Sequence, residues 1–129
     1  MLIWPAAALL AFLFGGLHLA VNAGENWLGS VNLVIAGFLL AFTLQRTGNL
    51  WFAIGIHAAW DWAQSFAFGV PDSGITVVGH LLNPTFQGSK WMAGGTVGPE
   101  GSVVTLLGYV FAFALINFRF PETRYKIGQ

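Results

Sequence analysis

Residues 50–70, LWFAIGIHAAWDWAQSFAFGV, decide the fold, because they are long and apolar enough to cross a bilayer and yet carry two ionisable side chains. His57 and Asp61 stand four residues apart, so on a helix both lie on one face, one turn from each other. Ionisable groups at membrane depth are costly and usually face the interior of a helix bundle. A second histidine, His18, lies in another apolar stretch. We therefore expect these three side chains to be buried and to form an intramembrane polar site.

The composition indicates an integral membrane protein. Of the 129 residues, 56% are hydrophobic and only 8% are charged, whereas a soluble domain carries about 25% charged residues. The formal net charge is zero, so nothing indicates a nucleic-acid partner, and the lipid bilayer is the expected surrounding. The chain has no cysteine, which excludes disulfides, thiolate metal sites and a cysteine nucleophile.

Three further apolar runs accompany residues 50–70 and predict an all-α, polytopic membrane bundle with four transmembrane helices. The expected spans are residues 2–21, 28–44, 50–70 and 103–120, within a single transmembrane domain that covers residues 1–129. The second run is short for a span of about 20 residues, and snorkelling of Arg46 would complete it. The loop 71–101, rich in glycine and proline, is expected to be extramembrane and is long enough to fold back over the mouth of the bundle.

Aromatic and basic residues near the expected helix ends indicate how the bundle sits in the membrane. Five tryptophans lie where indole rings favour the membrane interface, namely Trp4, Trp27, Trp51, Trp62 and Trp91. Trp60 lies beside the His57 face instead, and we expect it to line the site. Basic residues lie after the second and fourth spans, which predicts that both of these ends are cytoplasmic; they are Arg46, Arg119, Arg124 and Lys126.

Two histidines and one carboxylate suit three chemistries, which the residues alone leave open. His18, His57 and Asp61 could bind a divalent metal such as zinc with one open position. They could also act in general acid–base catalysis, or the two histidines could ligate haem. In the alternative, the histidines have structural roles only: His18 would be hydrogen-bonded to backbone or water near the interface, and His57 would form a structural pair with Asp61. The third histidine, His80, is expected to be solvated in the loop.

A hydrolytic site also needs a carboxylate near the attacked carbonyl. Of the five carboxylates, we expect only Asp61 to lie at membrane depth. Glu25 follows His18 by two helical turns, but residues 22–24, Asn-Ala-Gly, are expected to end the helix before it. We therefore expect Glu25 to stay outside the site.

The motifs Phe14-x-x-x-His18 and His57-x-x-x-Asp61, in this order and spacing, resemble those of the CPBP intramembrane protease family. This family contains the CAAX prenyl endopeptidases and the bacteriocin-immunity (Abi) proteins. Residues 44–51 and 94–101 are similar to the bacterial members, so the resemblance covers nearly the whole chain. It implies a bacterial or archaeal cell membrane, and peptide-bond hydrolysis at or within that membrane. A prenylated C-terminus, a peptide or a membrane protein would be the substrate.

The resemblance also assigns roles to the three candidate residues. His18 would be the histidine on the side of the attacking water, while His57 and Asp61 would stabilise the oxyanion or bind metal. The family pattern has a Glu-Glu-x-x-x-Arg motif ahead of Phe14, and no Glu-Glu pair occurs in this sequence. We interpret the chain as the C-terminal portion of a longer metalloprotease, so whether this polypeptide is itself an enzyme stays open. The alternative is a relative without the glutamates, which would be a non-catalytic membrane interaction or immunity protein.

Overall fold

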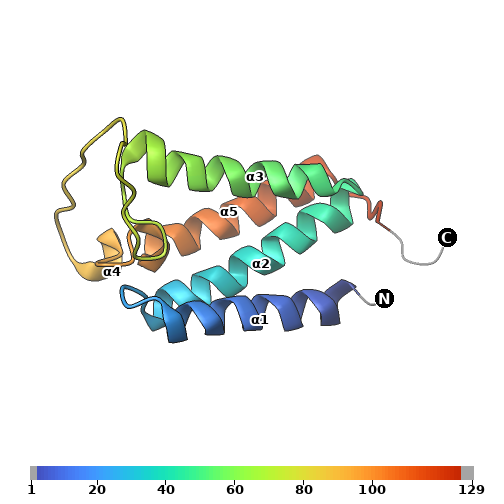
Figure 1. Cartoon of the computed structure of the whole chain (residues 1–129). Helices are drawn as coiled ribbons and strands as arrows, with labels where there is room; N and C mark the ends of the chain where they lie inside the picture. Colours follow the sequence, from blue (N-terminus) through green and yellow to red (C-terminus); the bar gives the residue numbers. More distant parts are fainter. Residues whose placement is uncertain (1–2, 126–129) are drawn as a thin grey trace.

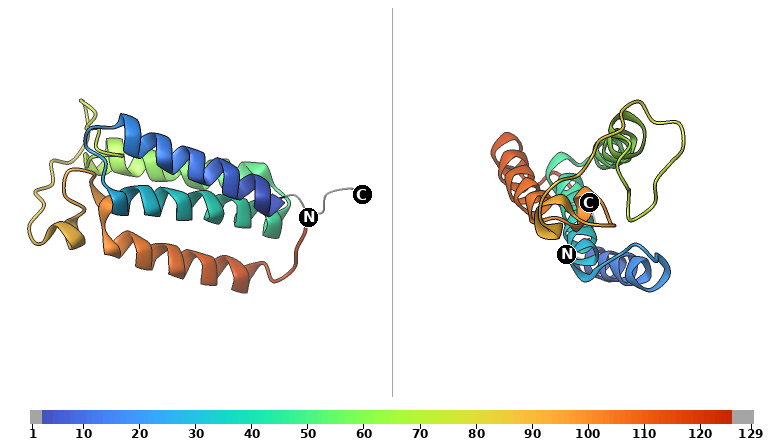
Figure 2. Two further views of the ribbon diagram at one scale, coloured as in Figure 1. Left: turned by 90° about the horizontal axis from the view of Figure 1, so that it is seen from below. Right: turned by 90° about the vertical axis from the view of Figure 1, so that its left-hand side faces the viewer.

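The computed structural model describes residues 3–125 and is built from helices. Four long helices lie side by side along one direction (Figures 1 and 2): α1 (Ile3–Val21), α2 (Trp27–Thr47), α3 (Leu50–Trp62) and α5 (Val103–Arg119). The π-helix η1 (Ala63–Phe68) continues α3, and the short α4 (Lys90–Ala93) and η2 (Pro99–Gly101) lie in the loop before α5. Helix α2 is central, because it packs against α1, α3 and α5. The predicted all-α architecture is therefore confirmed.

Polar caps at the helix ends explain where the long apolar runs begin and stop. The side chain of Asn26 accepts a hydrogen bond from Gly29 N at 2.9 Å and caps α2, and that of Asn49 accepts one from Trp51 N at 2.9 Å and caps α3. Between them Gly48 closes α2 in the left-handed conformation, with φ of 66°. Ser102 caps α5 through Thr105 N at 3.1 Å. These caps satisfy backbone groups that the helices leave unpaired.

Small residues allow α1 and α2 to approach each other closely. A Cβ atom placed on Gly15 would lie 2.7 Å from Val34 Cγ2, and one on Gly37 would lie 2.8 Å from Ala11 Cβ. Ser30 Oγ donates a hydrogen bond to Gly15 O at 2.5 Å across the same contact. Close backbone approach with an interhelical hydrogen bond is the usual way in which helices associate inside a membrane.

The expected spans agree with the helices in number and place, but their limits differ. Helix α2 extends to Thr47 and so contains Arg46 in its last turn, and snorkelling of this side chain stays a prediction. The third run is α-helical only to Trp62, continues as a π-helix to Phe68, and stops at Gly69, whose φ is 62°. The expected first residue of the first span, Leu2, lies outside the described residues, as does Lys126.

Within the described part of the chain, two helices are long and apolar enough to cross a membrane, α1 and α2. Helix α5 is apolar but shorter, and α3 becomes a π-helix after 13 residues. Helices of this kind point to a membrane protein, and the count of four transmembrane spans stays a prediction.

The loop 71–101 folds over one end of the bundle, near the link between α1 and α2 (Figure 1). Among the hydrogen bonds that hold it there, Gln64 Nε2 donates to Pro71 O at 3.3 Å, Thr96 Oγ1 to Gly24 O at 3.0 Å, and Leu81 N to Phe66 O at 2.8 Å. Its return into α5 is fixed at η2 by a side chain from the centre of the bundle, as described next.

Candidate functional site

His57 and Asp61 lie on one face of α3, as their spacing predicts. His57 Nε2 is 3.5 Å from Asp61 Oδ2, an ion pair whenever the imidazole is protonated. The expectation that both side chains are buried is wrong for the described residues, because 52% of the His57 side chain and 49% of the Asp61 side chain are exposed. The reason is the packing, since α3 contacts α2 on one side and has no long-helix neighbour on its other side.

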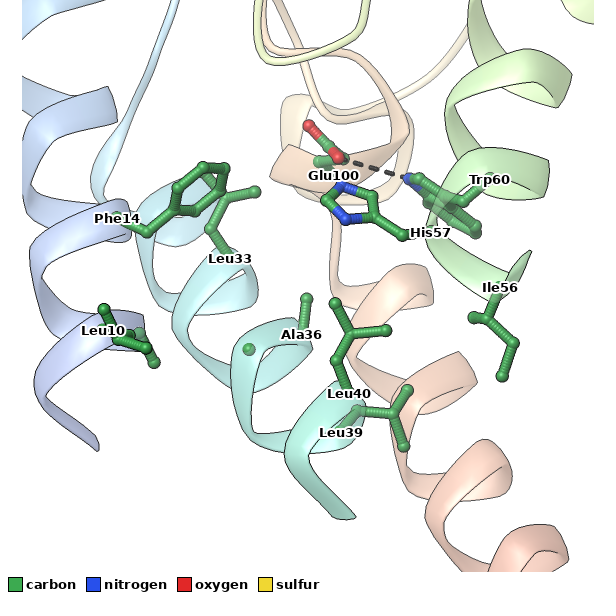
Figure 3. A pocket seen from close by; sticks show the side chains of 12 residues that line it. Leu10, Phe14, Leu33, Ala36, Leu39, Leu40, Ile56, His57, Trp60 and Glu100 are labelled. Carbon is green, nitrogen blue, oxygen red and sulfur yellow. Dashed lines mark hydrogen bonds between the residues drawn. The ribbon is translucent and has the colours of Figure 1, made fainter. Parts of the chain in front are cut away.

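A pocket of about 330 Å³ lies between α1, α2 and α3, and His57 stands at its polar end (Figure 3). Aliphatic and aromatic side chains form most of the wall, and Trp60 and Glu100 complete the polar end. The twelve lining residues are Leu10, Ala11, Phe14, Leu33, Ala36, Gly37, Leu39, Leu40, Ile56, His57, Trp60 and Glu100. The expectation that Trp60 lines the site is confirmed. Such a pocket suits an apolar group attached to a polar one.

Glu100 is the acidic residue at this polar end, and it is buried, with 4% of its surface exposed. Its Oε2 accepts hydrogen bonds from Ser73 N and Ser73 Oγ, both at 2.9 Å, and its Oε1 accepts one from Trp60 Nε1 at 3.2 Å (Figure 3). From the fully buried Asn32 on α2, Nδ2 donates to Glu100 O at 2.6 Å and to Ser102 O at 3.0 Å. The carboxylate therefore joins α3, the loop and η2 at the mouth of the pocket.

Burial raises the pKa of the Glu100 carboxyl above its ordinary value, because the charged form loses hydration. The hydrogen bonds from Ser73 and Trp60 oppose this shift, and the charge of Asp72 adds to it. Burial also raises the pKa of Asp72, and the nearby Asp61 carboxylate raises it further. Burial thus favours the protonated form of both Glu100, at the mouth of the pocket, and Asp72, in the adjoining loop.

His18 lies in the last turn of α1, and its ring is held by its own helix. Nδ1 lies 2.8 Å from Phe14 O, and the centroids of the two rings are 4.1 Å apart. Because a carbonyl oxygen can only accept, Nδ1 carries the proton of this hydrogen bond. In the neutral imidazole Nε2 then keeps a lone pair. Burial raises the pKa of the nearby Glu25; the hydrogen bond from Asn26 N and, more weakly, His18 oppose this shift.

The predicted divalent metal has no assembled ligand set among residues 3–125. No group of three histidine, aspartate or glutamate side chains there lies close enough together to hold a metal ion. His57 and Asp61 form a pair, and the described contacts of His18 are with its own helix and not with this pair. The present arrangement therefore does not fit three-ligand coordination, and metal binding by these residues stays a prediction.

The sequence interpretation missed Glu100, since it expected only Asp61 among the carboxylates at membrane depth. A carboxylate in a run of glycine, threonine, valine and proline has no periodicity that reveals burial. The available signal was the similarity of residues 94–101 to bacterial members of the family. Helix α1 ends at Val21, before it reaches Glu25, as the sequence predicted. His80 is half-buried, and its ring lies beside Gly69, where the expectation was solvation.

Comparison with known protein families matches the part of the chain that contains both histidine motifs. The family model described as type II CAAX prenyl endopeptidase Rce1-like matches residues 2–63, just under half of the 129-residue chain. This segment contains the described parts of α1, α2 and α3, with His18, His57 and Asp61. Searches of curated proteins and of solved structures found no match. The resemblance to the CPBP family, to which the CAAX prenyl endopeptidases belong, is thereby confirmed for this segment.

Proposed function

We propose that this chain takes part in peptide-bond hydrolysis at the membrane, as a CAAX-type endopeptidase. The observation that carries the proposal is His57 at the polar end of an apolar pocket, paired with Asp61 on the same helix and with the buried Glu100 at the same end of the pocket. The match of residues 2–63 to an Rce1-like endopeptidase family supports the same kind of chemistry. A peptide or membrane-protein substrate, including one with a prenylated C-terminus, would place its apolar part in the pocket.

In this proposal His57 stabilises the oxyanion that develops on the carbonyl oxygen when water attacks the carbonyl carbon. When the imidazole is protonated, Nε2–H faces Asp61 and Nδ1–H is free to donate to the oxyanion. Asp61 stabilises the imidazolium, so it acts by positioning and charge. His18 acts on the water side: its Nδ1 is occupied by Phe14 O, so Nε2 can accept a proton from the attacking water and return one to the leaving amine.

We give Glu100 a positioning role in this reaction. Its three accepted hydrogen bonds hold Trp60 and Ser73, and through them the wall of the pocket beside His57.

The test compares three histidine variants of the protein in proteoliposomes, with a quenched fluorogenic peptide offered in farnesylated and unmodified forms. His18→Ala and His57→Ala should each lower the cleavage rate by about 10²–10⁴-fold, which is the usual worth of a positioned acid–base group. His80→Ala is the matched control, because this loop histidine belongs to neither candidate motif, and it should keep the wild-type rate. If His18→Ala and His57→Ala, at equal expression, cleave the peptide as fast as His80→Ala, the proposal is contradicted.

A non-catalytic membrane interaction or immunity-type role is the second candidate, and one observation favours it. The hydrogen bond from His18 Nδ1 to Phe14 O and the contact of the two rings are what a purely structural histidine would make. This candidate predicts that a partner-dependent function survives both His18→Ala and His57→Ala. Metal or haem binding without hydrolysis is the third candidate, and it predicts bound metal or a Soret band in the purified protein.

The glutamate pair that the family resemblance implies does not occur in the printed sequence. The intact mass of the native protein, purified from its own cells through a C-terminal tag, decides how this bears on activity. A larger mass with an upstream Glu-Glu-x-x-x-Arg peptide would supply the water-activating half of the site. A mass equal to that of residues 1–129 would favour the non-catalytic candidate.

A further inference from the structure

The loop after η1 exposes an unusual number of large apolar side chains. Eight of them lie between residues 75 and 92, and their exposed fractions run from 47% to 97%. They are Ile75, Val77, Val78, Leu81, Leu82, Phe86, Trp91 and Met92. A soluble loop would lose stability and solubility by presenting such a surface to water. Something of low polarity therefore covers it.

The loop is also poor in charged residues. Between Ser73 and Pro99 the sequence contains one charged residue, Lys90. In a water-facing segment, about a quarter of the residues would be charged. Lys90 is exposed and stands beside Trp91 at the start of α4. One basic residue beside an indole, with no carboxylate nearby in the sequence, suits the interface, where the ammonium group can face lipid phosphates.

The position of the loop brings it to the border of the membrane. The loop leaves the bundle after Phe68 and re-enters it at Ser102, and it runs over the same end of the bundle as the link between α1 and α2 (Figures 1 and 2). The rings of Trp91 and Trp27, the first residue of α2, meet edge to face, with centroids 5.8 Å apart. Both tryptophans are more than half exposed, as interfacial indoles usually are.

The backbone of the loop limits how deeply it can enter the bilayer. Among the described residues, segment 76–88 makes a single backbone–backbone hydrogen bond, from Leu81 N to Phe66 O. Unpaired N–H and C=O groups cannot be buried in hydrocarbon, where each would lose its water partner. The headgroup region offers both water and acyl chains, so it satisfies the backbone and the apolar side chains together.

From these observations we propose that residues 75–92 form a membrane-inserted loop that lies in the headgroup–acyl boundary of the bilayer. The apolar side chains enter the outer part of the acyl layer, and Lys90 faces the lipid phosphates. This proposal does not depend on the hydrolytic activity of the site.

The absence of cysteine allows a direct test by single-cysteine spin labelling in vesicles of phosphatidylcholine and phosphatidylglycerol. Val78→Cys and Phe86→Cys place labels on the loop. Val110→Cys, on the exposed apolar face of α5, is the control for the lipid core, and Thr123→Cys, at the exposed C-terminal end, is the control for water. The measurement is the collision rate of each label with oxygen and with a water-soluble nickel chelate.

We expect the labels at 78 and 86 to collide with oxygen more than with the nickel chelate, at a depth of about 5–10 Å below the phosphates. The label at 110 should lie deeper, and the label at 123 should favour the nickel chelate. Loop labels that behave like the label at 123 would place the loop in water and overturn the proposal. Loop labels shielded from both reagents would show a protein contact instead; label–label distances would then identify a second copy, and this outcome also overturns the proposal.

Discussion

At the scale of single residues, the mouth of the pocket depends on Glu100, whose carboxylate accepts three hydrogen bonds while almost fully buried. The residues that could be predicted were His57 and Asp61, because their spacing in one helix fixes their proximity. The contact between Trp60 and Glu100 could not be predicted, since it joins residues 40 positions apart through a loop without periodicity.

Replacement of Glu100 by glutamine should flatten the dependence of stability on pH. Burial raises the pKa of Glu100 in the folded chain, so the folded state binds its proton more tightly than the unfolded state. The stability from this group is present below the ordinary glutamate pKa and is lost as the pH rises through the folded-state value. Glutamine does not titrate, so Glu100→Gln removes this loss of stability at higher pH. A smaller decrease of stability with rising pH remains, because the pKa of Asp72 is raised as well.

The measurement for Glu100→Gln is the thermal unfolding midpoint in detergent across the acidic to neutral range. Glu122→Gln removes an exposed carboxylate outside the bundle and is expected to keep the wild-type slope. A Glu100→Gln slope equal to that of the wild type would mean that the carboxyl does not titrate in this range.

At the scale of helices, the apolar runs predicted four helices. The structure places their beginnings and ends at polar caps and at a left-handed glycine, namely Asn26, Gly48, Asn49 and Ser102. The change from α3 to the π-helix η1 had no such signal, because residues 63–68, AQSFAF, have an ordinary helical composition. A π-turn next to Asp61 is of interest, since such turns are often found at functional sites.

Two neighbouring glycines of α1 provide a matched test of the α1–α2 contact. A Cβ atom at Gly15 would lie 2.7 Å from Val34 Cγ2 and 2.9 Å from Ser30 O, whereas one at Gly16 meets nothing within 4 Å. Gly15→Ala should therefore destabilise the fold by about 1–3 kcal/mol through overpacking. Gly16→Ala should be neutral or stabilise it by up to about 1 kcal/mol through helix propensity.

The free energy of unfolding of both glycine variants can be measured in mixed micelles. Gly15→Ala should also displace His18, which lies one turn further along α1, and so reduce any peptide cleavage more than Gly16→Ala does. Equal stability of the two alanine variants would contradict the close helix contact.

At the scale of the whole molecule, polar contacts between distant segments hold the loop on the bundle. Asn32 is fully buried in α2, and its Nδ2 donates to the carbonyl groups of Glu100 and Ser102 at the entrance to α5. The far end of the bundle has a comparable link, in which Arg46 donates to Asn117 Oδ1 at 2.6 Å and to Pro121 O. Neither link was predictable, because each pairs residues about 70 positions apart that have no common pattern.

Loss of the Asn32 link should loosen the loop without unfolding the helices, and trypsin can report this. Lys90 is the one tryptic site between Arg46 and Arg119, so a cut there divides the chain into two defined fragments. Asn32→Ala leaves buried carbonyl groups unpaired, which costs about 1–3 kcal/mol, and should raise the rate of this cut by about 5–100-fold if loop opening governs cleavage. Asn117→Ala removes a link at the opposite end of the bundle and should leave the rate at Lys90 unchanged. If both variants are cut at Lys90 as slowly as the wild type, the loop is held by its contacts with lipid rather than by Asn32.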